Sequence, residues 1–223
     1  YLPNAERTRN DVRAHSVEHK LGIHASPTCT MIYGDREGAI GYLVGEENRG
    51  LACMFTMMNL ARLAVGLQGV GIAERATQQA LQYAHERKQG RAAGATGEGS
   101  SPIVAYPDVK RMLLQARSAV EGLRALAAWT TLNISIGQSQ RPEAETAAML
   151  ADLMTPVIKA FGTDMGFEAA NLGMQCYGGH GYIRDNGVEQ FVRDSRINQV
   201  YEGANGVQAM DLVGRKLGRI QEE

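Results

Sequence analysis

Hydrophobic positions change their spacing once along the chain, at about Leu51. Before that point, segments such as Thr28–Tyr33 and Ala39–Val44 are rich in Thr, Ile, Tyr and Val and are separated by glycine and aspartate. This pattern predicts two to four short β-strands joined by turns. Because so small a sheet is marginal by itself, we expect residues 1–46 either to be the C-terminal remnant of a β-domain or to lean on the helical part.

From about Leu51 onward the apolar positions follow helical spacing, with one every three or four residues. Three helices are expected to be long, the first of roughly ten turns, and two are expected to be short. The predicted fold is therefore mainly α: an up-down four-helix bundle in residues 47–223, preceded by a few strands. The predicted helices are Leu51–Lys88, Pro107–Asn133, Glu143–Cys176, Val188–Asn198 and Asn205–Leu217.

Glycine and proline mark special positions within this pattern. Gly66, Gly69 and Gly71 lie inside the first helix, where each costs about 1 kcal/mol relative to alanine, so we expect another helix or a ligand to approach closely there. Pro156 is expected to bend or interrupt the third long helix. Residues 90–102 form a loop of small residues with no apolar anchor, which predicts mobility.

Composition and charge narrow the class of protein. The chain has 223 residues, of which 44% are hydrophobic and 21% are charged, as in globular proteins. Lys and Arg number 23 against 24 Asp and Glu, so no broad basic surface for nucleic acid is expected. No apolar run approaches the ~20 residues that cross a bilayer, so no membrane span is expected. Cys29, Cys53 and Cys176 lie far apart, which predicts neither disulfides nor a metal site and favours a reducing, cytoplasmic compartment.

Glu202 is the strongest candidate for acid–base chemistry. It lies between two predicted helices, in the sequence Val200-Tyr201-Glu202-Gly203. A carboxylate walled by apolar groups loses hydration and becomes a better proton acceptor, which suits a general base. The alternative is an ordinary exposed loop glutamate.

Two further motifs could bind a ligand. Gly178, Gly179 and Gly181 in the sequence YGGHGY free backbone N–H groups for a planar or phosphorylated ligand, or else form a corner between helices. Arg87 ends the first long helix, where a cation complements the helix dipole or contacts a phosphate at a subunit interface. We expect a structural hydrogen bond from His180.

These motifs, in this order and spacing, resemble the acyl-CoA dehydrogenases. The first long helix ends in Glu-Arg-Lys at residues 86–88, YGGHGY follows at 177–182, and RDSRINQVYEGANGVQ follows at 193–208. The resemblance covers nearly the whole chain and is closest to the larger bacterial type of this family. It implies that residues 1–46 end the family's middle β-domain, that residues 47–223 form its C-terminal bundle, and that the chain is part of a longer enzyme.

The resemblance also implies an activity and a cofactor. Family members use FAD to introduce a double bond between the α- and β-carbons of an acyl-CoA, and many of them take the α-proton with a glutamate in a Tyr-Glu-Gly motif. Glu202 matches that base. The positions that match cofactor contacts are Arg87, Gln175, Gly178, Gly179, Gly203 and Asn205, and those that match substrate contacts are Asn59, Arg62 and Tyr201.

The match to the cofactor contacts has departures, and two other functions stay open. Many members have Thr and Gln where this chain has Ala204 and Gly206, so direct side-chain contacts to FAD are in question there unless Asn205 substitutes. The implied partners are an acyl-CoA substrate, an electron-transfer flavoprotein and further copies of the chain in a homodimer or homotetramer. The alternatives are an acyl-CoA oxidase, or a non-catalytic helical module that oligomerises or binds CoA esters.

Overall fold

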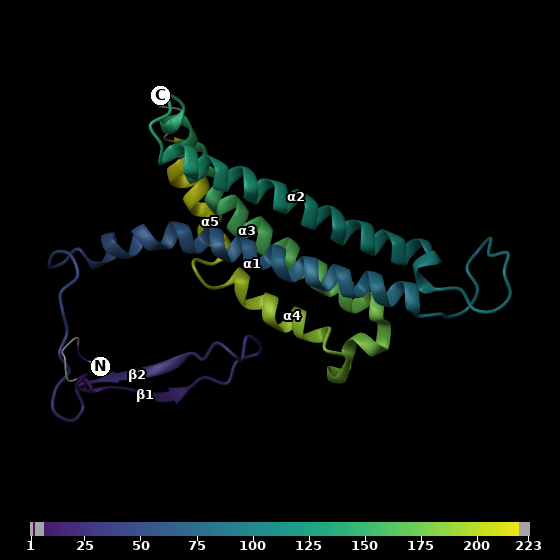
Figure 1. Ribbon diagram of the computed structural model, residues 1–223, viewed down its shortest axis with the longest axis horizontal. Helices are drawn as coiled ribbons and strands as arrows, with labels where there is room; N and C mark the ends of the chain where they lie inside the picture. Colours follow the sequence, from purple (N-terminus) through teal and green to yellow (C-terminus); the bar gives the residue numbers. More distant parts are fainter. Residues whose placement is uncertain (1, 3–6, 219–223) are drawn as a thin grey trace. The chain divides into compact units, whose positions relative to one another are not determined.

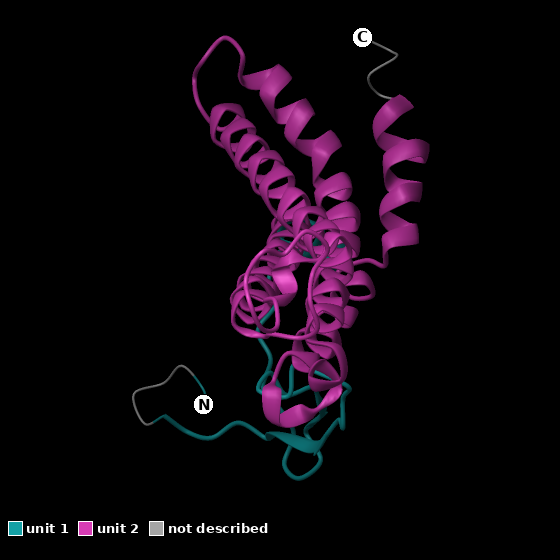
Figure 2. Ribbon diagram, turned by 90° about the vertical axis from the view of Figure 1, so that its right-hand side faces the viewer, with its two compact units in different colours: residues 1–57 teal, residues 58–223 magenta. Residues whose placement is uncertain are grey.

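The computed structural model describes residue 2 and residues 7–218 of the chain. It divides into two compact units, residues 1–57 and residues 58–223 (Figure 2). The division lies within the first long helix, whereas the sequence predicts a boundary between residues 46 and 47, which stays a prediction.

The first unit contains an antiparallel β-hairpin. Strand β1 (Val12–Val17) pairs with strand β2 (Cys29–Tyr33), with Val12 opposite Tyr33 and Val17 opposite Cys29. The register shifts between Ala14 and Ser16, as it does at a β-bulge. These two strands confirm the predicted strand content at its lower limit.

The strand predicted at residues 39–44 is wrong, because this segment is irregular in the structure. The Asn10 side chain occupies the backbone groups that a neighbouring strand would use. Its Nδ2 donates to the carbonyl of Ile40 (2.8 Å) and its Oδ1 accepts the N–H of Ile40 (3.0 Å). An amide side chain thus replaces one pair of ladder hydrogen bonds, and the β-prone composition is overridden.

From Gly50 to residue 218 the described chain is mostly helical, which confirms the predicted fold class. The three long helices lie side by side in Figure 1, and α2, α4 and α5 all contact α3. Pro107 begins the second helix, where its fixed backbone angle is favourable. The helices are α1 (Gly50–Glu86), α2 (Pro107–Gly137), α3 (Ala144–Tyr177), α4 (Glu189–Arg196) and α5 (Asn205–Asp211), the last continued by a π-helical turn at Leu212–Lys216.

Glycines let α1 and α3 touch backbone to backbone. A Cβ on Gly69 would overlap the carbonyl of Gly162, and a Cβ on Gly166 would lie 2.7 Å from the carbonyl oxygen of Gly69. Gly66 and Gly162 face each other in the same way, and a Cβ on Gly66 would meet Ile158. The predicted close approach is confirmed for Gly66 and Gly69, whereas the position of Gly71 is open on all sides.

Pro156 does not interrupt α3, which runs unbroken from Ala144 to Tyr177. Without an N–H, Pro156 cannot bond the carbonyl of Asp152, four residues earlier. The buried Lys216 Nζ donates to that carbonyl and also to Asp152 Oδ1 (2.6 Å). The C-terminal helix therefore supplies the hydrogen bond that proline removes from α3.

The loop at residues 90–102 has an anchor that its composition did not predict. Ala92 is 8% exposed, and its N–H donates to the hydroxyl of Ser101, which is equally buried. Lys88 and Pro102 form an antiparallel bridge at the base of the loop. The prediction that the loop lacks an apolar anchor is therefore wrong.

Helix α1 is the one helix in the described part of the chain that is long and apolar enough to cross a membrane by length and composition. From residue 58 onward, its Val65, Val70, Ala73 and Ala80 are buried inside the second unit. One such helix is weak evidence for a span, because the core helix of a bundle passes the same test.

We expect Gly69→Ala to lower the thermal stability of the intact protein. The added methyl group overlaps the backbone of α3, and overpacking of this kind costs on the order of 1–3 kcal/mol. Gly71→Ala on the same helix is the matched control. It should stabilise by up to about 1 kcal/mol through helix propensity, so equal melting temperatures for the two variants would contradict the close packing.

The link between Pro156 and Lys216 predicts a coupled pair of substitutions. Lys216→Met should destabilise by about 1–3 kcal/mol, because it leaves a buried carbonyl without a donor. In a Pro156→Ala background, the new N–H can bond that carbonyl within α3, so the same substitution should cost less. Denaturation of the four proteins of this double-mutant cycle measures the coupling, and strictly additive costs would rule out the link.

Candidate functional site

The loop that carries Glu202 has an uncommon backbone conformation. It follows a 3₁₀ turn at Ile197–Gln199 and precedes α5. Glu202 has φ +53° and Gly203 has φ +86°, so two consecutive residues are left-handed. This conformation costs about 1–3 kcal/mol for a residue with a side chain, and it persists only where the surroundings impose it. Glu202 itself is half-buried.

Gln208 imposes part of this conformation from the first turns of α5. Its side chain is 1% exposed, and its Nε2 donates to the carbonyls of Gly203 (3.0 Å) and Glu202 (3.4 Å). A Cβ on Gly203 would collide with the same Nε2. Only glycine at position 203 therefore satisfies both the backbone angle and the contact.

Tyr201 ties the other end of the loop to α1. Its hydroxyl donates to Gln68 Oε1 and lies 3.1 Å from Asn198 Oδ1. Burial and the charge of Glu202 raise the pKa of Tyr201 above its ordinary value, although the hydrogen bond with Gln68 acts in the opposite direction. The phenol therefore stays protonated and keeps its role as a donor.

Asn205, the first residue of α5, holds the loop against α3. Its Nδ2 donates to the carbonyl of Ala160 (3.2 Å), to Thr163 Oγ1 (3.0 Å) and to Asp164 Oδ1 (2.7 Å). Its Oδ1 accepts a hydrogen bond from Lys159 Nζ (3.0 Å). One amide thus joins the start of α5 to more than one turn of α3.

Lys159 is an ammonium group enclosed by the bundle. Its side chain is 0% exposed, and burial lowers its pKa from 10.5 to about 8. The negative charges of Asp164 and Glu202 act to raise this pKa, whereas the positive charge of Arg62 lowers it further.

Arg62 is engaged within the bundle. Its guanidinium forms an ion pair with Asp211 (3.1 Å), and both side chains are about nine-tenths buried. Burial acts to raise the pKa of Asp211, but the hydrogen bond from Arg215 and the charges of Lys216, Arg215 and Arg62 outweigh it and hold that pKa below its ordinary value. Asn59 lies one turn earlier on α1 and is exposed. Their predicted place at an acyl-CoA entrance stays a prediction.

The remaining predicted cofactor residues line one cavity of about 440 Å³. Tyr83 and Tyr177 stack there with ring centroids 3.9 Å apart, and the hydroxyl of Tyr83 lies 2.7 Å from His180 Nδ1. The expected structural hydrogen bond of His180 is therefore present. The four predicted residues on the cavity wall are Arg87, Gln175, Gly178 and Gly179.

The predicted site residues thus fall into two groups along α3. Asn205 contacts α3 around Lys159 and Thr163, whereas the cavity lies at the end of the helix, beside Gln175. At 1.5 Å per residue, the sixteen residues between Lys159 and Gln175 span about 24 Å. One copy of the chain therefore does not bring the Glu202 loop and Arg87 to the same place.

Lys159, Gln208 and Asp211 were missed by the reading of the sequence. Of these three residues, only Lys159 could have been identified from the sequence pattern. It lies on the buried face of α3, four residues after Thr155 and four before Thr163. A charged residue on a core stripe is unusual unless it has partners. Gln208 and Asp211 have no such signal, because both lie in a short polar helix.

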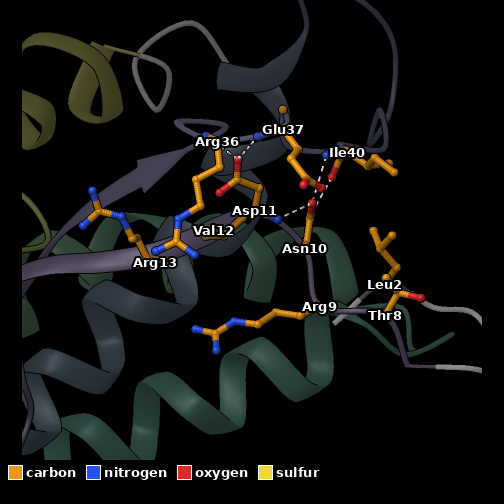
Figure 3. Close-up of a pocket in the computed structure, with 11 residues that line it drawn as sticks. Leu2, Thr8, Arg9, Asn10, Asp11, Val12, Arg13, Arg36, Glu37 and Ile40 are labelled. Carbon is orange, nitrogen blue, oxygen red and sulfur yellow. Dashed lines mark hydrogen bonds between the residues drawn. The ribbon is translucent and has the colours of Figure 1, made fainter.

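A separate cavity of about 470 Å³ lies in the first unit, and none of the predicted site residues lines it. Figure 3 shows Asp11 accepting the backbone N–H groups of Arg36 (2.8 Å) and Glu37 (2.9 Å), which lower the pKa of the Asp11 carboxyl. Arg13 forms an ion pair with Asp35 (2.5 Å). These bonds shape the turn after β2, so the side chains of Asp11 and Arg13 already have structural partners.

No metal cluster stands out in the described part of the chain, and the buried thiol of Cys176 is unreactive. No three His, Cys, Asp or Glu side chains gather there closely enough to hold a metal ion. Cys29, Cys53 and Cys176 are free thiols. Burial raises the pKa of Cys176 to about 11, so this thiol, which lines the cavity beside Gln175, stays protonated and unreactive at neutral pH.

Comparison with known proteins gives the class. The family model described as the C-terminal domain of acyl-CoA dehydrogenase matches residues 48–217. The chain therefore belongs to the acyl-CoA dehydrogenase family.

Individual relatives agree with this assignment. The chain is 49% identical to 3-methylmercaptopropionyl-CoA dehydrogenase of Ruegeria pomeroyi, over 95% of this chain and 36% of that protein. It is 35% identical to the broad-specificity linear acyl-CoA dehydrogenase FadE5 of Mycobacterium tuberculosis, again over 95% of this chain and 36% of that protein. The resemblance to the larger bacterial type is confirmed, and the chain spans about a third of the length of these relatives.

Solved structures show the same fold. An acyl-CoA dehydrogenase of Bacillus anthracis complexed with FAD superposes with a TM-score of 0.77 at 26% identity, covering 95% of this chain and 36% of that one. Butyryl-CoA dehydrogenase of Megasphaera elsdenii gives a TM-score of 0.75 at 25% identity, covering 93% and 49%. The helical unit therefore has the arrangement of a family domain.

We expect Gly203→Ala to loosen the Glu202 loop. The substitution imposes a left-handed backbone on alanine and pushes its methyl group into Gln208, so peptides covering residues 197–211 should exchange amide hydrogens at least tenfold faster. Gly206→Ala, whose added methyl meets nothing within 4 Å, is the control and should leave exchange unchanged. Equal protection in the two variants would contradict the proposed constraint.

Proposed function

We propose that the chain is the C-terminal part of an FAD-dependent acyl-CoA dehydrogenase in which Glu202 is the catalytic base. In the proposed reaction, the Glu202 carboxylate takes a proton from the α-carbon of an acyl-CoA thioester. A hydride leaves the β-carbon, and the product is the 2-enoyl-CoA. When bound, FAD supplies the chemistry that accepts the hydride. The constrained, half-buried loop around Glu202 carries this proposal.

The loop has the properties that a general base needs. Proton abstraction from carbon requires a carboxylate fixed at one distance and direction, because misplacement by 1 Å can cost a factor of 10² in rate. Gln208, Tyr201 and Asn205 each hold a different part of the loop and limit its motion. Tyr201 also stays a neutral donor, so the segment retains its hydrogen bonds across the neutral pH range.

The cavity at the end of α3 has the chemistry to hold part of FAD. Arg87 is an exposed cation suited to a pyrophosphate. A Cβ on Gly178 or Gly179 would meet nothing within 4 Å, so the backbone there is open to a ligand. Because Gln175 on the cavity wall lies about 24 Å along α3 from Lys159, which contacts Asn205, we propose that the cavity serves the cofactor of a neighbouring subunit.

An apolar groove supports assembly into a homodimer or homotetramer. It has a volume of about 430 Å³, and its walls include Leu81 on α1 and Leu113 and Leu114 on α2. Leu81 is 44% exposed and Leu114 is 67% exposed. Apolar surface of this kind is typical of an interface, and a second copy of the chain is the partner that we propose.

We further propose that an electron-transfer flavoprotein accepts the electrons and that the enzyme acts in the bacterial cytoplasm. One solved structure that superposes on this chain is described as the electron transferring flavoprotein of Acidaminococcus fermentans, with a TM-score of 0.74 at 27% identity. This likeness supports the proposal that an electron-transfer flavoprotein is the electron acceptor of the enzyme. Slow reoxidation of the reduced flavin by oxygen would separate this function from that of an oxidase.

Glu202→Gln in the full-length, FAD-loaded protein tests the proposed function. We expect acyl-CoA to bind nearly as before, because the amide has the same shape, and the rate of flavin reduction to fall by at least about 10²- to 10⁴-fold. Stopped-flow absorbance of the flavin measures the rate, and titration of the flavin spectrum measures binding.

Glu168→Gln serves as the control, because Glu168 is an exposed residue on α3. It should leave both the rate and the binding unchanged. A Glu202→Gln protein that reduces its flavin at the wild-type rate would refute the assignment and favour a base elsewhere or a non-catalytic module.

A further inference from the structure

Buried polar atoms without a partner gather around the Glu202 loop. Within the described residues, four buried side-chain nitrogen or oxygen atoms have no hydrogen-bond partner. Three of them belong to residues that lie against this loop: Arg62 Nε, Asn198 Nδ2 and Gln208 Oε1. A buried polar atom without a partner is unfavourable, and natural proteins keep few of them. Their concentration at one loop therefore calls for an explanation.

Arg62 approaches the loop from α1. The residue is 7% exposed, and its Nε lies 3.9 Å from the position that a Cβ on Gly203 would take. The guanidinium is held there by its ion pair with Asp211, whose Oδ2 lies 3.1 Å from Arg62 Nη1. The unpartnered Nε–H is therefore fixed beside the residue that follows the proposed base.

Gln208 lies against the same loop from α5. Its Nε2 donates to the carbonyls of Gly203 (3.0 Å) and Glu202 (3.4 Å). These two bonds fix the orientation of the amide, because exchanging its nitrogen and oxygen would set Oε1 against two carbonyl oxygens. Gln208 Oε1 is therefore a buried acceptor that needs a donor.

Arg62 is the donor that the fold brings to Gln208. Both side chains have atoms within 4 Å of one point, the Cβ position on Gly203. Asp211 follows Gln208 by three residues on α5, and residues at this spacing are neighbours on one face of a helix. The ion pair with Asp211 thus holds the guanidinium along the face that carries Gln208.

We infer that Arg62 is a positioning residue for the Glu202 loop: its Nε–H donates to one internal water molecule, which donates in turn to Gln208 Oε1. The two side-chain atoms form no direct hydrogen bond with each other. A water molecule suits the pair because it accepts one hydrogen bond and donates another, and internal waters commonly satisfy buried polar groups in this way. The inference rests on the proposed function of Glu202 as the base.

The link has a defined effect on the loop. It locks the Gln208 amide in the orientation that holds the carbonyls of Glu202 and Gly203. Loss of the link would loosen the placement of the base and slow the chemical step, while acyl-CoA would still bind. A direct contact between Arg62 and the substrate, which the family resemblance implies, would act on acyl-CoA binding instead.

A double-mutant cycle in the full-length, FAD-loaded protein tests the link. Arg62→Lys keeps a cation for Asp211 but has a carbon in place of Nε, and Gln208→Met removes the amide. Arg62→Lys should speed amide hydrogen exchange in peptides covering residues 197–211 by about 5- to 30-fold. In a Gln208→Met background, the same substitution should change exchange by less than about twofold, because the partner of the link is already gone.

Flavin reduction separates positioning from substrate contact. At saturating acyl-CoA, Arg62→Lys should slow the reduction by about tenfold or more and change the Kd of acyl-CoA by less than about twofold. Arg111→Lys is the control, because Arg111 is an exposed arginine on α2, and it should change neither exchange, rate nor binding. An Arg62→Lys protein with wild-type exchange, with equal loosening in both backgrounds, or with weakened binding at a normal rate would overturn the inference.

A crystal structure of the wild-type, full-length protein with FAD reads the link without any variant. We expect one ordered water molecule within about 3.3 Å of both Arg62 Nε and Gln208 Oε1, and the same water after a non-reactive acyl-CoA analogue binds. An Nε–H that donates to the analogue or to the Glu202 carboxylate would overturn the inference, even if the Gln208→Met protein fails to fold.

The two proposals fail in distinguishable ways. If no acyl-CoA reduces the wild-type flavin, the proposed function fails, and the role of Arg62 in positioning a base falls with it, even if the water is present. If acyl-CoA reduces the flavin and Glu202→Gln abolishes the reaction, but Arg62→Lys leaves hydrogen exchange and the reduction rate unchanged, only the inference about Arg62 fails.

Discussion

The hydrogen bonds between α3 and the first residue of α5 determine the position of the candidate site. Asn205 joins α5 to Lys159, Thr163 and Asp164 on α3, and Gln208 of α5 donates hydrogen bonds to the carbonyls of Glu202 and Gly203. The left-handed backbone at both positions is unfavourable by itself. These side chains oppose that cost, so a short polar loop becomes a fixed support for one carboxylate.

The packing of α1 on α3 determines which residues of α1 reach the candidate site. Glycine contacts let the two helices meet at the backbone, and this contact fixes which residues of α1 face the loop. Gln68 lies beside Gly69 and reaches Tyr201, while Arg62 lies about two turns earlier and reaches Asp211. The packing of small residues and the polar contacts of the loop therefore depend on each other.

Hydrophobic spacing was sufficient to predict the helices, because each long helix buries one side and the period of that side is local information. The strand predicted at residues 39–44 is absent because a distant side chain, Asn10, provides the hydrogen bonds that a strand would have made. The break expected at Pro156 is absent because Lys216 supplies a donor from another helix. The motifs singled out Glu202, Arg87 and their neighbours as candidates, but not the buried Lys159 and Gln208. Lys159 contacts Asn205, which is more than forty residues away, and Gln208 contacts a loop whose conformation is not periodic. Hydrophobic periodicity encodes neither contact.

The central claim is that the Glu202 side chain is directed at the reacting carbon of a bound thioester. A crystal structure of the full-length protein with FAD and a non-reactive acyl-CoA analogue tests this claim most directly. The account predicts a Glu202 carboxylate oxygen about 3–3.5 Å from the α-carbon, with Gly203 still hydrogen-bonded to Gln208. A Glu202 side chain that faces solvent, away from the thioester in every subunit, would contradict it.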